Sequence, residues 1–180
     1  MTLTEKALQL ALTAHAGQTR KSDGTPYIAH PVMVAFSLQS YGFDESVIAA
    51  ALVHDVLEDT DVPRQALADV LGEEVVQIVE GVSEDTSLQW EVRKEKYVAR
   101  VATASVATKA VSIADKIHNA ESVIAYHATK GKEAWAVFNR GKEKKLWFEN
   151  MLYTEVSKTW EHPMLERYKE LITIMEDLEA

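Results

Sequence analysis

The sequence contains no cysteine, which excludes disulfide bonds and any metal site built from thiolates. It also has no apolar run long enough for a signal peptide or a membrane-spanning helix. Seven glycines and four prolines among 180 residues are too few for a flexible or proline-rich linker that would divide the chain. We therefore expect a single cytoplasmic domain that covers residues 1–180.

Basic side chains are scarce as well. The chain has 28 acidic against 19 basic residues and a formal net charge of −9. Non-specific binding of nucleic acid depends on lysine and arginine that neutralise phosphates, so this balance argues against a nucleic-acid partner. An acidic protein can still bind a small phosphorylated molecule, provided that a basic cluster or a metal ion supplies positive charge locally.

Hydrophobic periodicity is helical along nearly the whole chain, and alanine is abundant, which predicts an all-α fold. Thr2 and Glu5 have the spacing of a capping box at the start of the first helix. The irregular segment 17–30 has room for one short β-hairpin. The candidate functional motifs fall within about residues 1–125, and further helices are expected over about 131–178.

The stretch "ALVHDVLEDT", residues 51–60, follows an apolar run without a polar spacer. It contains His54, Asp55, Glu58 and Asp59, and burying such groups is costly unless something compensates them. On one continuous helix they form two adjacent i,i+4 columns that lean to the same side. The carboxylates repel each other unless a cation or protons intervene. Imidazole with carboxylate oxygens suits a divalent ion such as manganese, iron, zinc or magnesium.

One helix cannot surround a metal ion, so further ligands are expected from other segments. His30 in "YIAHP" ends the irregular segment, and Asp115 in "VSIADKIHN" follows an apolar run. His118 and Asn119 come three and four residues after Asp115 and therefore lie on the same side of a helix. Taken singly, His30 could be a loop histidine, and Asp115 with Lys116 a solvated pair. Two histidines and two carboxylates from three elements would leave room for water, which a catalytic metal site requires.

Three motifs together carry a family resemblance. "HAGQTRKSDGTPYIAHP", "AALVHDVLEDT" and "IADKIHN", in this order and spacing, resemble the hydrolase domain of the RelA/SpoT-homologue proteins, which are HD-domain phosphohydrolases. The remainder, with "VRKEKY" and tryptophan-rich helices, is similar to the single-domain small alarmone hydrolases. The resemblance implies an all-helical HD-domain bundle and, in the stringent response, hydrolysis of the 3′-pyrophosphate of ppGpp or pppGpp to pyrophosphate and a nucleoside 5′-di- or triphosphate.

The resemblance also implies one Mn²⁺ ion and assigns roles to particular residues. The residues implied are, for the metal, His30, His54, Asp55 and Asp115; for activation of the attacking water, Glu58 and Asp59; for the base, Arg20, Lys21 and Ser22; for the ribose and 3′ phosphate, Asn119; and for the 5′ phosphates, Arg140 and Lys144. Other basic residues of the same helices, such as Lys94 and Lys145, could equally belong to solvated faces.

Several alternatives remain open at the level of sequence. Ser112 stands where the family commonly has a basic residue, which alters the expected phosphate contacts. The base of the substrate is undetermined, so an adenosine alarmone such as ppApp, or an HD-domain phosphatase acting on NADPH, is an alternative. A non-catalytic alarmone-binding module is another, although the intact Glu58 and Asp59 argue against it. The sequence is compatible with a monomer or a homodimer, with a nucleotide substrate and with no membrane partner.

Overall fold

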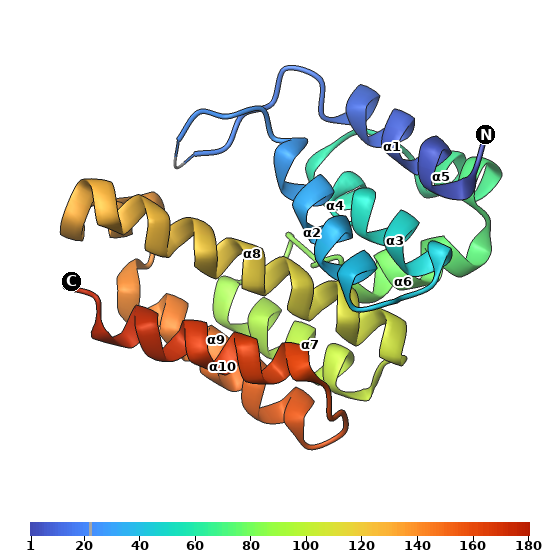
Figure 1. Cartoon of the computed structure of the whole chain (residues 1–180). Helices are drawn as coiled ribbons and strands as arrows, with labels where there is room; N and C mark the ends of the chain where they lie inside the picture. The colour runs from blue at the N-terminus through green and yellow to red at the C-terminus, as the bar shows by residue number, and fades with distance from the viewer. Residues whose placement is uncertain (22) are drawn as a thin grey trace.

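A computed structural model describes residues 1–21 and 23–180. Within this range the regular structure is helical, and no helix combines the length and apolar character that a membrane crossing requires. The elements, drawn in Figure 1, are α1 (Leu3–Ala14), α2 (Ala29–Ser40), α3 (Glu45–Leu52), α4 (Val56–Asp59), α5 (Arg64–Leu71), α6 (Glu73–Val82), α7 (Trp90–Thr103), α8 (Val106–Lys130), the 3₁₀ helix η1 (Gly131–Val137), α9 (Gly141–Ser157) and α10 (Pro163–Asp177).

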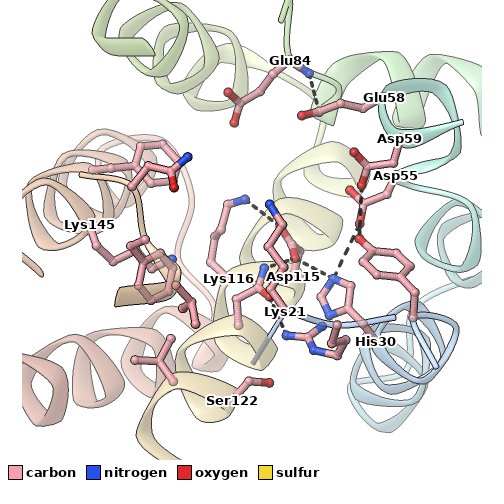
Figure 2. Close-up of a pocket in the computed structure, with 18 of the residues that line it drawn as sticks. Lys21, His30, Asp55, Glu58, Asp59, Glu84, Asp115, Lys116, Ser122 and Lys145 are labelled. Carbon is pink, nitrogen blue, oxygen red and sulfur yellow. Dashed lines mark hydrogen bonds and ion pairs between the residues drawn. The ribbon is translucent and has the colours of Figure 1, made fainter. Parts of the chain in front are cut away.

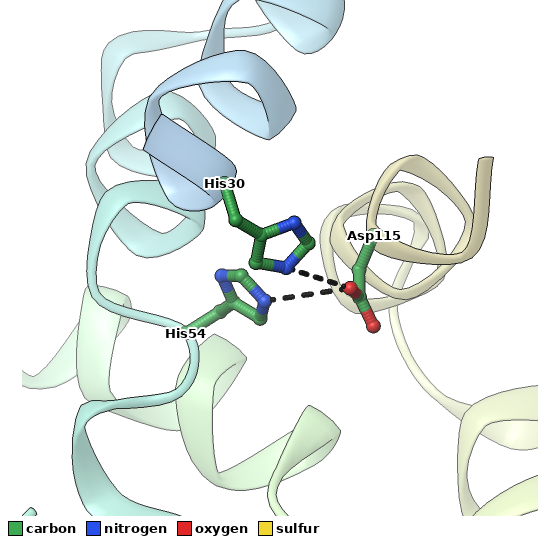
Figure 3. Close-up of side chains that lie close together, drawn as sticks. All are labelled: His30, His54 and Asp115. Carbon is green, nitrogen blue, oxygen red and sulfur yellow. Dashed lines mark ion pairs between the residues drawn. The ribbon is translucent and has the colours of Figure 1, made fainter. Parts of the chain in front are cut away.

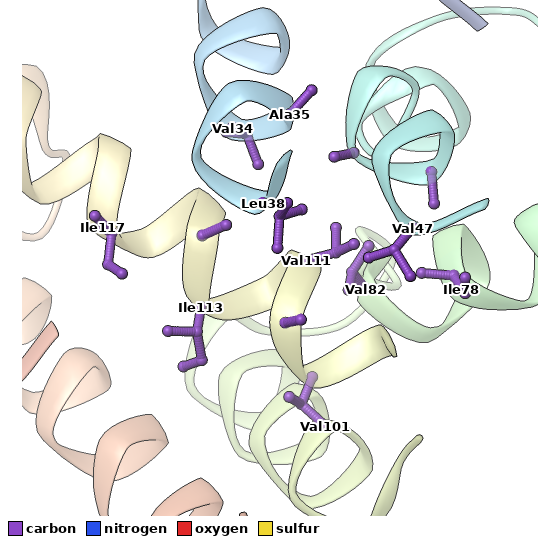
Figure 4. Close-up of a cluster of buried hydrophobic side chains, with 14 of the residues drawn as sticks. Val34, Ala35, Leu38, Val47, Ile78, Val82, Val101, Val111, Ile113 and Ile117 are labelled. Atoms are coloured by element: carbon purple, nitrogen blue, oxygen red, sulfur yellow. The ribbon is translucent and has the colours of Figure 1, made fainter. Parts of the chain in front are cut away.

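The long helix α8 lies at the centre of the fold (Figure 1). It packs against α2, α3 and α6 on one side and against α10 on the other, while α7 packs against α9. Figure 4 shows side chains of several helices meeting around α8, among them Leu38 of α2 and Val111 of α8, both fully buried. One cluster of buried residues extends from Ala7 to Met175. The C-terminal helices therefore share a core with the segments that carry the motifs.

Local signals in the sequence account for the start of two helices. The predicted capping box is confirmed: the Glu5 N–H donates to Thr2 Oγ1 at 3.1 Å, and the Thr2 N–H donates to Glu5 Oε2 at 2.8 Å. Ser105 caps α8 by accepting from the Thr108 N–H at 3.2 Å. These caps satisfy backbone donors that have no partner inside the helix.

The segment between α1 and α2 turns back on itself. An isolated antiparallel bridge joins Thr19 and Pro26, the Arg20 N–H donates to the Thr25 carbonyl at 2.9 Å, and the Tyr27 N–H donates to the Gln18 carbonyl at 2.9 Å. The short hairpin expected here is therefore an isolated bridge, not a ladder, in the described part of the segment. The turn carries its residues toward α8 (Figure 1).

The expectation of one continuous helix through His54 and Asp59 is wrong. α3 ends at Leu52, a three-residue turn follows, and α4 begins at Val56. The His54 Nδ1–H donates to the Ala51 carbonyl at 2.7 Å, which is the carbonyl that the Asp55 N–H would use in a continuous helix. Because the chain turns at this point, His54 and Asp55 both reach the same buried centre instead of lying in separate columns.

Candidate metal centre and adjoining cleft

Three buried side chains from distant parts of the chain meet at one point (Figure 3). His30 comes from the start of α2, His54 from the turn after α3, and Asp115 from the middle of α8. Asp115 Oδ1 lies 3.0 Å from His30 Nε2 and 3.7 Å from His54 Nε2. The ligand atoms of the group all lie within 4.8 Å of one another.

The donor set fits a divalent metal ion. Two imidazole nitrogens and a carboxylate oxygen are ligands for zinc, iron or manganese. Among the described residues, the buried His54 Nε2 has no hydrogen-bond partner, and a buried polar atom without a partner is costly. A cation at this point would satisfy it.

Asp55 adjoins the three residues. Its Oδ2 lies 3.1 Å from His54 Nε2 and 3.8 Å from His30 Nε2, and it accepts a hydrogen bond from the Tyr27 hydroxyl. Burial alone would raise the pKa of Asp55, but the neighbouring His54 holds it well below its usual value. Burial alone would likewise lower the pKa of His54, and the Asp55 and Asp115 carboxylates raise it well above its usual value. Asp55 therefore carries its negative charge toward the same centre.

Further contacts fix the direction in which Asp115 and His30 point. Lys116 Nζ lies 2.6 Å from Asp115 Oδ2, and Asn119 Nδ2 donates to Asp115 Oδ1 at 2.6 Å. Burial would raise the pKa of Asp115, but Lys116 together with the histidines lowers it well below its usual value. On the other side of the centre, His30 Nδ1 lies 2.7 Å from Nδ1 of His118. Burial lowers the pKa of His118 to about 4.

Two more carboxylates stand beside this group (Figure 2). Glu58 Oε2 accepts from the backbone N–H of Glu84 at 3.0 Å, and Asp59 Oδ2 lies 3.5 Å from the Tyr27 hydroxyl. Burial raises the pKa of Glu58, and the Glu84 carboxylate adds to the rise. Burial also raises the pKa of Asp59, with a contribution from the charge of Asp55. Both carboxylates are therefore better proton acceptors than an exposed acid.

All of these groups except His118 line one cavity of about 900 Å³, a volume typical of a small-molecule site. Arg20 and Lys21 reach it from the turn after α1, and Arg20 Nη2 donates to Asn119 Oδ1 at 3.3 Å. Ser22, the third residue implied for base binding, lies outside the described residues.

The wall of the cavity that lies opposite the candidate metal ligands also carries basic side chains. Figure 2 shows Lys145 across the cavity from His30. Lys94 Nζ lies 4.5 Å from the centre of the Phe148 ring and 2.5 Å from Glu84 Oε1. Arg140 lines the cavity, whereas Lys144 is not among its lining residues and lies 3.3 Å from Glu91.

Comparison with known families gives one model that matches most of the chain: the HD-domain model aligns with residues 7–140. This chain belongs to the HD-domain family.

Curated relatives of this HD-domain protein support the resemblance to RelA/SpoT-homologue hydrolases. The guanosine-3′,5′-bis(diphosphate) 3′-pyrophosphohydrolase MESH1 of Danio rerio is 40% identical over 117 residues, which cover 63% of this chain and 65% of the relative. The bifunctional (p)ppGpp synthase/hydrolase SpoT of Escherichia coli is 37% identical over 120 residues, which cover 63% of this chain and 17% of the relative. The chain thus spans less than two thirds of the length of either protein.

Solved structures confirm the all-α HD-domain fold. A metazoan ortholog of SpoT, described as hydrolysing ppGpp, superposes with a TM-score of 0.81 at 24% identity over 97% of this chain and 96% of that one. The Listeria monocytogenes protein lmo0812 superposes with a TM-score of 0.76 at 30% identity over 82% of this chain and 99% of that one. The C-terminal helices are therefore part of the shared fold.

The structure also adds residues to the site that sequence reasoning did not assign to it. Tyr27 contacts Asp55, and the only signal for it was its place three residues before His30. Lys116 forms a mostly buried pair with Asp115, so the interpretation of these two as a solvated pair is wrong. Ser112 Oγ lies 2.6 Å from the hydroxyl of the buried Tyr97 and lines the cavity.

Proposed function

We propose that this HD-domain protein is a metal-dependent hydrolase of the 3′-pyrophosphate of guanosine or adenosine alarmones, such as ppGpp, pppGpp and ppApp. The products are pyrophosphate and the nucleoside 5′-di- or triphosphate. The observation that carries the proposal is a single cavity that joins the histidine–aspartate centre, two carboxylates of raised pKa and basic side chains on two sides. In a chain of net charge −9, such local positive charge suits a nucleotide with phosphates at both its 3′ and its 5′ positions.

The metal would be held by His30, His54, Asp55 and Asp115, with Mn²⁺ as the ion that we propose. When bound there, the ion supplies a Lewis acid that stabilises negative charge on the phosphate oxygens. The chain's own contribution is to keep the ligands buried and aligned: Lys116 and Asn119 hold the Asp115 carboxylate from two sides.

In the proposed reaction, the oxygen of a water molecule bonds to the phosphorus that is attached to the ribose 3′ oxygen. The bond between that phosphorus and the 3′ oxygen breaks, and the 3′ oxygen takes up a proton. Glu58 and Asp59 position the water and accept its proton, a role that their raised pKa values support. The Glu84 N–H holds Glu58 in place for this.

The substrate contacts follow from the lining of the cavity. Arg20 and Lys21 would bind the base, since a planar guanidinium can stack on a purine and an ammonium can donate to its ring acceptors. Asn119 would lie next to the ribose and 3′ phosphate. For the 5′ phosphates we propose Arg140 and Lys145, which line the cavity, in place of Lys144, which does not.

We further propose that residues 1–180 act as one cytoplasmic hydrolase domain, as a monomer or a homodimer, without a nucleic-acid or membrane partner.

The test is product analysis with purified protein and Mn²⁺ on ppGpp, ppApp and NADPH, each with and without a chelator. We expect pyrophosphate from ppGpp or ppApp and none after chelation. Release of orthophosphate from NADPH, with no product from ppGpp or ppApp, would mean that NADPH and not an alarmone is the substrate. No product from any nucleotide, together with alarmone binding, would favour a binding module instead.

A matched pair of variants addresses the catalytic carboxylates. Glu58→Gln and Asp59→Asn remove the proton acceptors and nearly preserve side-chain shape, so nucleotide binding should persist while turnover falls by about 10²-fold or more. Undiminished turnover in both variants would contradict the assigned roles.

A further inference from the structure

The two nitrogens of the His30 ring face different partners. Nε2 lies 3.0 Å from Asp115 Oδ1 in the candidate metal centre, and Nδ1 lies 2.7 Å from Nδ1 of His118. The two rings are tilted by 42°, with their centroids 4.8 Å apart. A hydrogen bond between two imidazole nitrogens needs one N–H donor and one lone pair, so its direction depends on the tautomers of both rings.

The second histidine of the centre has a different kind of partner. His54 Nδ1 lies 2.7 Å from the Ala51 carbonyl, which can accept a hydrogen bond but cannot donate one. A proton is therefore fixed on His54 Nδ1, and Nε2 is the nitrogen left to bind a metal. His118 is not restricted in this way, because an imidazole nitrogen can either donate or accept.

This difference has a consequence for metal binding. A histidine binds a metal through an unprotonated nitrogen and commonly donates its other N–H to a second group. For His30 to bind through Nε2, its proton must be on Nδ1, and His118 Nδ1 must accept it. Without a metal, the His30 Nε2–H can donate to Asp115. In that state His30 Nδ1 carries no proton, and it accepts a hydrogen bond from the His118 Nδ1–H.

We propose that His118 is a positioning residue for the metal, and that it lets His30 change tautomer on metal binding without losing its hydrogen bond. The inference rests on the metal site proposed above. On loading, the proton leaves His30 Nε2, the proton on His118 Nδ1 moves to His30 Nδ1, and His118 takes up a proton on Nε2. The two rings together hold the same number of protons before and after, and both stay neutral.

The first test needs no variant. Long-range ¹⁵N–¹H spectra of histidine-labelled protein report which ring nitrogen carries the proton, with diamagnetic Zn²⁺ as the probe. We expect His30 to change from Nε2–H to Nδ1–H on addition of Zn²⁺, and His54 to keep Nδ1–H throughout. In the loaded protein, a nitrogen–nitrogen coupling should connect His30 Nδ1 with His118 Nδ1. If His30 keeps one tautomer in both states, or if that coupling is absent, the proposal is overturned.

The second test measures the Mn²⁺ dissociation constant from the electron paramagnetic resonance signal of the free ion. His118→Ala should weaken binding by about 10- to 100-fold, the usual effect of losing such a partner. His118→Asn should stay close to wild type, since an amide can also donate or accept.

His127→Ala is the matched control, because His127 lies on the same helix, does not line the cavity, and has its Nε2 against the Glu179 carbonyl. Unfolding of each metal-free variant separates lost affinity from lost structure. Binding by His118→Ala within about twofold of wild type would overturn the proposal. If the wild type itself binds no Mn²⁺, the metal site fails, and this inference fails with it.

Discussion

Glu149 is fully buried in α9, and replacing it with glutamine tests how a buried charge is maintained beside the cavity. Its carboxylate pairs with Lys145 one turn earlier and accepts a hydrogen bond from the Tyr168 hydroxyl of α10. The Lys145 side chain is 13% exposed, so water screens the pair only slightly. Removing one partner of a buried ion pair costs about 3–5 kcal/mol, because the other charge is left uncompensated.

Glu149→Gln and Lys145→Met should therefore each lower the free energy of unfolding by about 3–5 kcal/mol. For a domain of this size that corresponds to a fall in Tm of roughly 6–20 °C. The double variant leaves no charge unpaired, so its loss should be smaller than the sum of the single losses by more than about 1 kcal/mol.

Urea unfolding of the wild type and the three variants measures these differences, and unchanged m-values would show that the transitions are comparable. Tyr168→Phe is the matched comparison, since it removes a hydrogen bond to the same carboxylate without removing a charge, at a cost of about 1.5–3 kcal/mol. Single losses below about 1 kcal/mol, or strictly additive losses, would refute the reasoning.

Three further predictions concern the metal, the pH dependence and the packing. Mn²⁺ at a hundred times its dissociation constant should raise the free energy of unfolding by about 2.7 kcal/mol, and EDTA should reverse the gain. A wild type whose free energy of unfolding changes with neither Mn²⁺ nor EDTA would contradict the metal centre. Burial raises the pKa of Tyr97 to about 12, so the stability that comes from its neutral form is complete below about pH 10 and is lost as the pH rises through about 12. Tyr97→Phe should reduce that alkaline loss of stability by up to about 3 kcal/mol. Unfolding measured at a series of pH values checks this, and an unchanged dependence of the free energy of unfolding on pH would contradict it. A Cβ added at Gly81 would lie 2.6 Å from Thr108 Cγ2, so Gly81→Ala should cost about 1–3 kcal/mol, and Thr108→Ser, which removes that methyl group, should restore part of it.

Much of the helical architecture follows from short-range patterns. The capping box at Thr2 and Glu5 forms as its spacing predicts, since both partners lie within one turn. The turn after Leu52 does not follow from periodicity, because its apolar and ionisable residues fit a continuous helix equally well. In this turn the His54 Nδ1–H donates to the Ala51 carbonyl, and only the tertiary structure shows this hydrogen bond.

The basic residues likewise separate what the sequence predicts from what only the tertiary structure shows. Arg140, Lys144 and Lys145 belong to one run of the sequence, and composition does not separate them. Lys145 lines the cavity and pairs with the buried Glu149, whereas Lys144 lies near Glu91 and does not line the cavity. Residue types alone do not give the rotation of a helix about its axis, which depends on what the helix packs against.

The sequence by itself determined the class of fold, the absence of thiol chemistry and the types of metal-ligating residue, because these depend on composition, periodicity and motif spacing. The motifs already predicted that His30, His54 and Asp115 meet. The tertiary structure alone decided that Lys116 and His118 contact them and that two basic walls share one cavity. These contacts join residues as many as 88 positions apart. Such pairings come from how helices pack around α8, and no local pattern in the chain encodes them.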